Sequence, residues 1–138
     1  MTMTMTDEQF MASFEDASLS SDAFHHEGHV RMAFLYLSRY PALEALQRFS
    51  GSLARLAAVR GKPELYHETI TWAFLLLIRE RMVRAKKVQS CAEFCAANSD
   101  VLNWKENVLK KYYRDDTLAS DLARRVFLLP DKAVSPHA

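Results

Sequence analysis

The stretch from Ile70 to Ile78 is apolar on nearly every side of a helix, and it constrains the fold more than any other part of the chain. A helix that is apolar all round belongs in the interior of a bundle, where other helices cover it. Pro63 suits the first position of such a helix, and the pattern continues to about Lys87. The sequence therefore predicts a long central helix from Pro63 to Lys87.

The rest of the chain also has apolar residues at helical spacing, and it shows no alternation of apolar and polar residues typical of strands. Three glycines and four prolines in 138 residues are few, which favours long helices over short strands joined by tight turns. We expect an all-α, single-domain helical bundle of four main helices plus shorter C-terminal helices, with flexible tails at 1–6 and 130–138. Apolar spacing and capping residues predict the other helices at Asp7–Asp16, 22–40, Pro41–Val59, Ser90–Ala97, Asp100–Tyr113 and Leu122–Phe127.

The charge balance argues against several classes of partner. A formal net charge of +1 provides no strong field for nucleic acid or an anionic membrane. The basic residues near 79–87 and 110–111 lie at predicted helix ends, where the helix dipole favours them. The apolar run from Trp72 to Ile78 is too short to span a bilayer, and the first residues lack the features of a signal peptide. We expect no nucleic acid partner and no membrane.

Cys91 and Cys95 are the two cysteines of the chain. Their spacing of four residues puts both on one helix face, and they form no Cys-x-x-Cys pair. Two thiols in this arrangement favour a reducing compartment, so we place the protein in the cytoplasm. Their simplest role is that of small buried apolar side chains, and a role in binding a metal is the alternative.

Three of the five histidines fall at positions 25–29, at the start of one predicted helix. Residues three or four apart on a helix are neighbours, so His29 can share a metal ion with His26 or with His25. The spacing alone leaves both choices open. A fourth histidine, His67, lies near the start of the central helix. If the beginnings of the two helices come together, their imidazoles converge.

The kind of ligands available indicates which class of metal ion the site would bind. Glu64-x-x-His67 matches half of the Glu-x-x-His device of di-iron bundles, but matching carboxylate-rich helices are missing. A triad of His26, His29 and His67 fits a single divalent transition metal better, with Zn, Fe, Ni and Cu as candidates. Such a triad leaves a coordination position open for water or for a small-molecule substrate.

The residues around His67 would complete such a site. Glu68 would act as a general base or would orient a ligand. Three neighbours with hydroxyl groups could position a substrate: Tyr66, Thr69 and Thr71.

Each of these residues also has an ordinary structural explanation. His25 and His26 can simply face solvent, and Glu68 suits the positive end of the helix dipole. Two functions therefore stay open, a metal-dependent enzyme acting on a small molecule and a non-enzymatic helical interaction protein with structural histidines. Neither hypothesis fixes an oligomeric state.

Two motifs resemble a group of small uncharacterised bacterial helical proteins. They are Phe24-x-His26-x-x-His29-Val30-x-x-Ala33 and Tyr66-His67-Glu68-Thr69-x-Thr71, and the likeness continues at Trp104-Lys105, Tyr112-Tyr113 and Leu118-Ala-Ser120. The resemblance covers nearly the whole chain after Asp7. It implies that His26 is the partner of His29, because the position of His25 varies in that group. It brings no established activity.

Overall fold

The structure is a computed structural model that describes residues 5–132, and every regular element among them is a helix. This confirms the all-α prediction. The chain divides into two compact units, residues 1–65 and residues 66–138. That the whole chain is a single domain stays a prediction. No helix among residues 5–132 combines the length and the apolar content that crossing a membrane requires.

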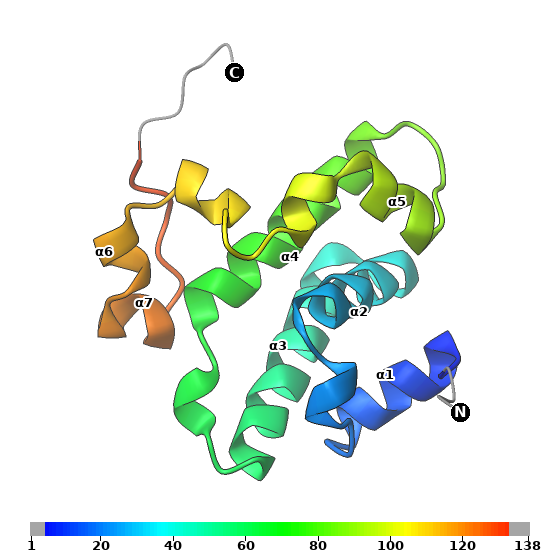
Figure 1. The fold of residues 1–138 in the computed structure, drawn as a ribbon, viewed down its shortest axis with the longest axis horizontal. Helices are drawn as coiled ribbons and strands as arrows, with labels where there is room; N and C mark the ends of the chain where they lie inside the picture. The colour runs from blue at the N-terminus through cyan, green and yellow to red at the C-terminus, as the bar shows by residue number, and fades with distance from the viewer. Residues whose placement is uncertain (1–4, 133–138) are drawn as a thin grey trace. The chain divides into compact units, whose positions relative to one another are not determined.

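Unit 1 is built from three α-helices that each contact the other two (Figure 1). Its elements are α1 (Asp7–Glu15), the 3₁₀ turn η1 (Ser21–Ala23), α2 (His26–Arg39), α3 (Ala42–Val59) and the 3₁₀ turn η2 (Pro63–Leu65). The predicted helix at 22–40 was too long at its start, because η1 and the extended His25 precede α2. Gly61, at φ 74°, ends α3 as expected of a glycine that follows a helix.

The core of unit 1 is a cluster of aromatic rings centred on Phe14, whose side chain is completely buried. Its ring centroid lies 5.3 Å from Phe24, 5.9 Å from Tyr36 and 5.4 Å from Phe49. The cluster brings together residues from α1, α2, α3 and the segment between α1 and α2. Tilted and edge-to-face rings at these separations attract one another beyond the area they bury.

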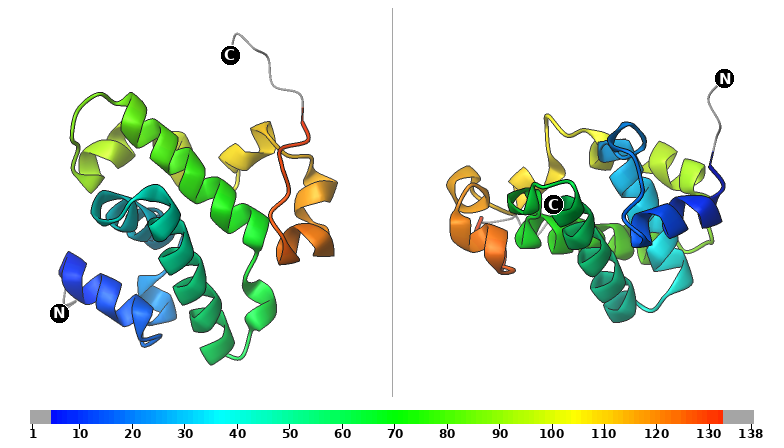
Figure 2. Two further views of the ribbon diagram at one scale, coloured as in Figure 1. Left: turned by 180° about the vertical axis from the view of Figure 1, so that it is seen from behind. Right: turned by 90° about the horizontal axis from the view of Figure 1, so that it is seen from below.

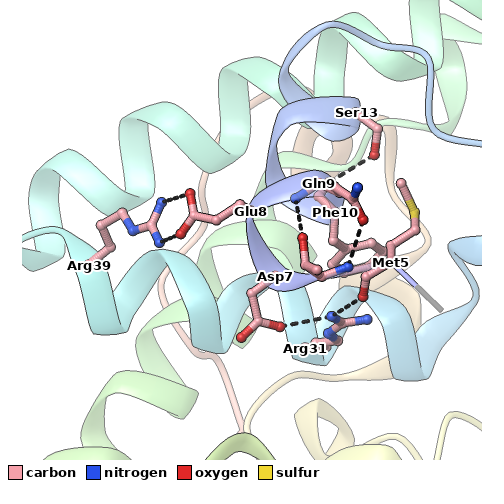
Figure 3. Close-up of polar contacts among 9 residues, drawn as sticks. Met5, Asp7, Glu8, Gln9, Phe10, Ser13, Arg31 and Arg39 are labelled. Carbon is pink, nitrogen blue, oxygen red and sulfur yellow. Dashed lines mark hydrogen bonds and ion pairs between the residues drawn. The ribbon is translucent and has the colours of Figure 1, made fainter.

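Polar contacts fix α1 along the length of α2 (Figure 3). Arg31 donates to the Asp7 carboxylate at 2.8 Å and to the Met5 carbonyl at 3.3 Å, and Arg39 forms a two-pronged ion pair with Glu8. Exposed ion pairs of this kind add little stability each. They set the direction of α1 while the aromatic cluster supplies most of the burial.

Unit 2 is organised along α4 (Glu68–Arg84), its longest helix (Figure 2). The other elements are α5 (Cys91–Ala97), η3 (Ser99–Leu102), η4 (Val108–Lys111), α6 (Asp115–Leu118) and α7 (Asp121–Arg125). The predicted helix from Pro63 to Lys87 was wrong at both ends. Pro63 belongs to η2 in unit 1, His67 is the N-cap of α4, and α4 ends at Arg84.

The predicted helix from Asp100 to Tyr113 is not a continuous helix. It consists of η3 and η4 with an irregular segment between them. The side chain of Asn103 accepts from the Glu106 N–H at 3.1 Å, and that of Asn107 accepts from the Leu109 N–H at 2.9 Å. Asparagine side chains that bond nearby backbone groups in this way compete with helical hydrogen bonding, which the apolar spacing alone did not reveal.

The predicted tails fall mostly on residues 1–4 and 133–138, which lie outside the described residues. Among the described residues, Thr6 caps α1, and its hydroxyl accepts from the Gln9 N–H at 3.1 Å. The Asp131 carboxylate accepts from the Arg114 N–H at 3.0 Å and from the Thr117 hydroxyl. Thr6 and Asp131 thus make specific contacts, and the flexibility of the tails stays a prediction.

We expect Phe14→Ala to lower the free energy of unfolding by about 3–5 kcal/mol, because it leaves a cavity among three aromatic rings. Urea unfolding followed by circular dichroism measures this change. Leu43→Ala is the control, since Leu43 is 81% exposed and should cost less than about 0.5 kcal/mol. Similar losses from both variants would show that the core is elsewhere.

Candidate functional site

The predicted site residues lie at the beginnings of two helices in different units. His26 and His29 belong to the first turns of α2 in unit 1, and the segment from Tyr66 to Thr71 opens α4 in unit 2. Across residues 5–132, no group of three or more His, Cys, Asp or Glu side chains is arranged so that it could hold a metal ion. The triad with His67 stays a prediction, and the contacts of each histidine bear on it.

Both ring nitrogens of His67 are occupied by backbone groups of unit 2. Nδ1 accepts from the Ile70 N–H at 3.0 Å and so caps the first turn of α4. A nitrogen that accepts carries no proton, so the proton of the neutral ring is on Nε2. Nε2 donates to the Leu118 carbonyl, 2.8 Å away at the end of α6. In this arrangement His67 has no free lone pair for a metal ion.

Thr69 fastens the segment that follows α7. Its hydroxyl donates to the Val126 carbonyl at 2.7 Å and accepts from the Leu128 N–H at 3.0 Å, and the residue is fully buried. The same segment is held by the Tyr113 hydroxyl, which donates to the Leu128 carbonyl at 2.7 Å. Thr69 therefore holds this segment, and its role in positioning a substrate stays a prediction. Sequence reasoning missed Tyr113, which it assigned to a helix, and no local signal links it to Leu128.

An aromatic contact strengthens this attachment. The ring of Trp72 stacks on that of Phe127, with centroids 5.4 Å apart and planes 22° from parallel. The helices α4 and α7 also make the most extensive contact between elements of unit 2. The start of α4 therefore holds the C-terminal part of unit 2 by hydrogen bonds and by apolar packing.

The remaining candidates lie in the first turn of α4 or just before it. The Tyr66 hydroxyl donates to the Glu68 carboxylate, and both residues are half-buried. Glu68 lies in the first turn of α4, where the helix dipole favours a negative charge. Thr71 is buried, with its own N–H bonded to the His67 carbonyl at 3.0 Å. A role for Glu68 as a base and for Tyr66 and Thr71 in binding a substrate stays a prediction.

His29 is enclosed in unit 1 and is neutral at physiological pH. Its ring stacks on Phe24 with centroids 3.9 Å apart and also makes a hydrogen bond to the Phe24 backbone. Burial, followed by the positive charges of His26, Arg60 and His25, lowers the pKa of His29 to about 4. The Phe24 backbone thus orients the ring through one nitrogen, and the ring stays neutral.

His26 and His25 differ in exposure. His26 is half-buried in the first turn of α2, whereas His25 is exposed at the N-cap and its side chain makes no capping hydrogen bond. His26 is therefore the more enclosed neighbour of His29.

No family model matches the sequence, and no curated protein or solved structure gives a match either. The resemblance to small bacterial helical proteins stays a prediction.

We expect Thr69→Val to lower the free energy of unfolding by about 1–3 kcal/mol, because it leaves the Leu128 N–H and the Val126 carbonyl without their partner. Thr69→Ser keeps the hydroxyl and should recover most of the loss. Denaturant unfolding of both variants gives the comparison. A serine variant as unstable as the valine variant would show that the methyl group of Thr69, and not its hydroxyl, is what matters.

We expect acid to remove a contribution that neutral His29 makes to stability. The folded state lowers the pKa of His29 from 6.5 to about 4, so the contribution is present above pH 6.5 and is lost as the pH falls from 6.5 towards 4. The full effect amounts to about 3 kcal/mol. Unfolding measured at several pH values should show a shallower decline for His29→Phe, whereas His25→Ala should follow the wild type. Parallel curves for wild type and His29→Phe would contradict the burial of His29.

Proposed function

We propose that this protein is a non-enzymatic helical interaction protein whose histidines serve the fold. The observation that carries this proposal is that both ring nitrogens of His67 bond backbone groups, one at the start of α4 and one at the end of α6. Thr69 uses its hydroxyl in the same way. Side chains whose donors and acceptors already bond backbone groups have few hydrogen-bonding groups left to bind a substrate.

The surface of the chain supports a role in binding other proteins. Large apolar side chains in contact with solvent mark interaction sites where they gather. Unit 2 exposes three of them within eight residues: Leu122 at 51%, Val126 at 44% and Leu129 at 77%. Such a concentration costs solubility unless a partner covers it.

A cytoplasmic location accompanies this proposal. Cys91 and Cys95 form no disulfide, in keeping with a reducing compartment. The nearly neutral net charge gives no reason to invoke a nucleic acid partner.

The second candidate function is a metal-dependent enzyme, and the state of His29 favours it. Ligand histidines must be neutral, and they commonly bond backbone through the other ring nitrogen, as His29 does with Phe24. Zn, Fe, Ni or Cu would be held by His26, His29 and His67. His67 would have to give up its bond to Ile70 or to Leu118 to take part. That cost makes this the weaker candidate.

The metal content of the protein separates the two functions. We expect elemental analysis of the protein purified without an affinity tag to find far less than one equivalent of any transition metal. The reason is that His67 offers no free lone pair. His67→Asn is the matched variant, since asparagine keeps the N-cap but cannot replace an imidazole ligand. One equivalent of metal in the wild type, lost in both His29→Ala and His67→Asn, would establish the enzyme candidate.

The interaction itself can be tested in cells. A photo-crosslinking amino acid at Trp104, which is 51% exposed, or at Leu122 should give discrete protein adducts. The same group at the exposed polar position Glu106 is the control. Adducts that are absent at the apolar positions, or equal at all three, would contradict an interaction function.

A further inference from the structure

The segment after α7 begins with an extended residue and is held by side chains of unit 2. Val126 has φ −136° and ψ 157°, and no helix or turn follows it up to Pro130. The Val126 carbonyl and the Leu128 N–H bond Thr69, and the Leu128 carbonyl accepts from Tyr113. The first two groups meet at one oxygen, and in an extended chain the backbone groups of alternate residues lie on the same side, so we expect all three on one side. Figure 1 shows this segment, in orange-red, leading away from α7.

The backbone groups of the alternate residues point to the opposite side. The N–H and C=O groups of Phe127 and Leu129 have no hydrogen-bond partner within residues 5–132. Buried backbone groups without partners are rare, so these four groups are expected to face water. The side chains beside them are open to solvent as well, since Leu129 is 77% and Val126 is 44% exposed. Within residues 5–132 the segment thus has hydrogen-bonded backbone groups at Val126 and Leu128 and free backbone groups at Phe127 and Leu129.

We propose that the segment from Val126 to Leu129 pairs antiparallel with the same segment of a second copy of this chain. This inference rests on the proposed interaction function and names the partner. A twofold axis through Leu128 places Phe127 opposite Leu129 of the second copy, and Leu129 opposite its Phe127. Each of these two pairs exchanges both backbone hydrogen bonds, as hydrogen-bonded antiparallel pairs do. Every free group on the edge then has a partner.

The short length of the free edge favours a second copy over a longer foreign strand. α7 ends at Arg125, and Pro130 follows the segment, so Phe127 and Leu129 are the residues that present the free edge. A twofold arrangement uses the groups of both residues and leaves none over. It also covers exposed apolar surface, because Leu129 comes to lie against Phe127 of the second copy.

The charges at the two ends of the segment are complementary in the same register. The pairing that sets Phe127 opposite Leu129 also brings Arg125 close to Asp131 of the second copy. Arg125 and Arg124 share the single carboxylate of Asp121, so this end of the segment carries excess positive charge. Asp131 is exposed and carries the opposite charge at the other end, although its carboxylate already accepts from the Arg114 N–H and the Thr117 hydroxyl.

Sedimentation of the full chain over a range of concentrations tests the pairing. We expect a reversible equilibrium between monomer and dimer in the wild type. Leu129→Pro removes an N–H that no group within residues 5–132 uses, and an extended residue before proline is unstrained. It should weaken the dimer about tenfold or more while leaving unchanged the unfolding midpoint measured at concentrations where the wild type is monomeric.

A second pair of variants keeps the test valid if Leu129→Pro disturbs the fold. Leu129→Glu places a charge on the paired surface and should also give a monomer. Leu43→Glu is its matched control, because Leu43 is 81% exposed on α3, and this variant should dimerise like the wild type. A dimer that survives both Leu129 variants would overturn the proposal.

A wild type that stays monomeric at every concentration would also overturn it. Photo-crosslinking from position 129 then shows what occupies the edge. Adducts with another protein would leave the interaction function standing without self-pairing. The metal content of the protein is independent of both outcomes, so failure of the dimer and failure of the proposed function can be told apart.

Discussion

The hydroxyl of Thr69 is the contact on which the organisation of unit 2 depends. It donates to the Val126 carbonyl and accepts from the Leu128 N–H, so a single side chain makes the hydrogen bonds that a neighbouring strand makes in a sheet. The oxygen is fully buried, and a buried hydroxyl is stable only when its hydrogen-bonding capacity is used. Because the position and direction of α4 fix Thr69, they also fix the path of the chain beyond α7.

His67 performs a related task with a different chemistry. A helix start leaves backbone N–H groups without partners, and an unprotonated imidazole nitrogen can accept from one of them. The other nitrogen then carries the proton and can reach a carbonyl, here that of Leu118. His67 therefore caps α4 and ties α6 to it with one ring. A residue that looks like a metal ligand in the sequence is, in its contacts, a link between two helices.

The helices of unit 1 could be predicted from the sequence because their signals are local. α3 begins within one residue of its predicted start, at a proline that fixes the entry, and ends at its predicted residue before Gly61. The apolar stripe of α2 was also evident, although the 3₁₀ turn before it was not. The errors occur where side chains bond backbone, as Asn103 and Asn107 do between η3 and η4. Periodicity of apolar residues does not register such bonds.

The candidate site could be predicted in composition but not in chemistry. Two of the residues that the sequence pointed to as metal ligands have specific contacts, since His29 is enclosed and His67 is engaged through both nitrogens. What decides between a ligand and a structural link is where each lone pair points. That depends on partners far away in the sequence, such as Leu118 for His67 and Val126 for Thr69. No pattern within the motif carries this information.

The segment from Val126 to Leu129 is held by side chains and not by a neighbouring strand, and this leaves some of its backbone groups free within residues 5–132. A strand in a sheet shares its hydrogen bonds with strands on both sides, whereas a segment held by Thr69 and Tyr113 is satisfied on one side only. Proteins usually shield a free edge by charge, by proline or by a covering element. Here Pro130 limits the edge in length, but Leu129 beside it is apolar and exposed. An edge that is short, rigidly held and flanked by apolar side chains is suited to a partner of the same short length, and a second copy of the segment has that length.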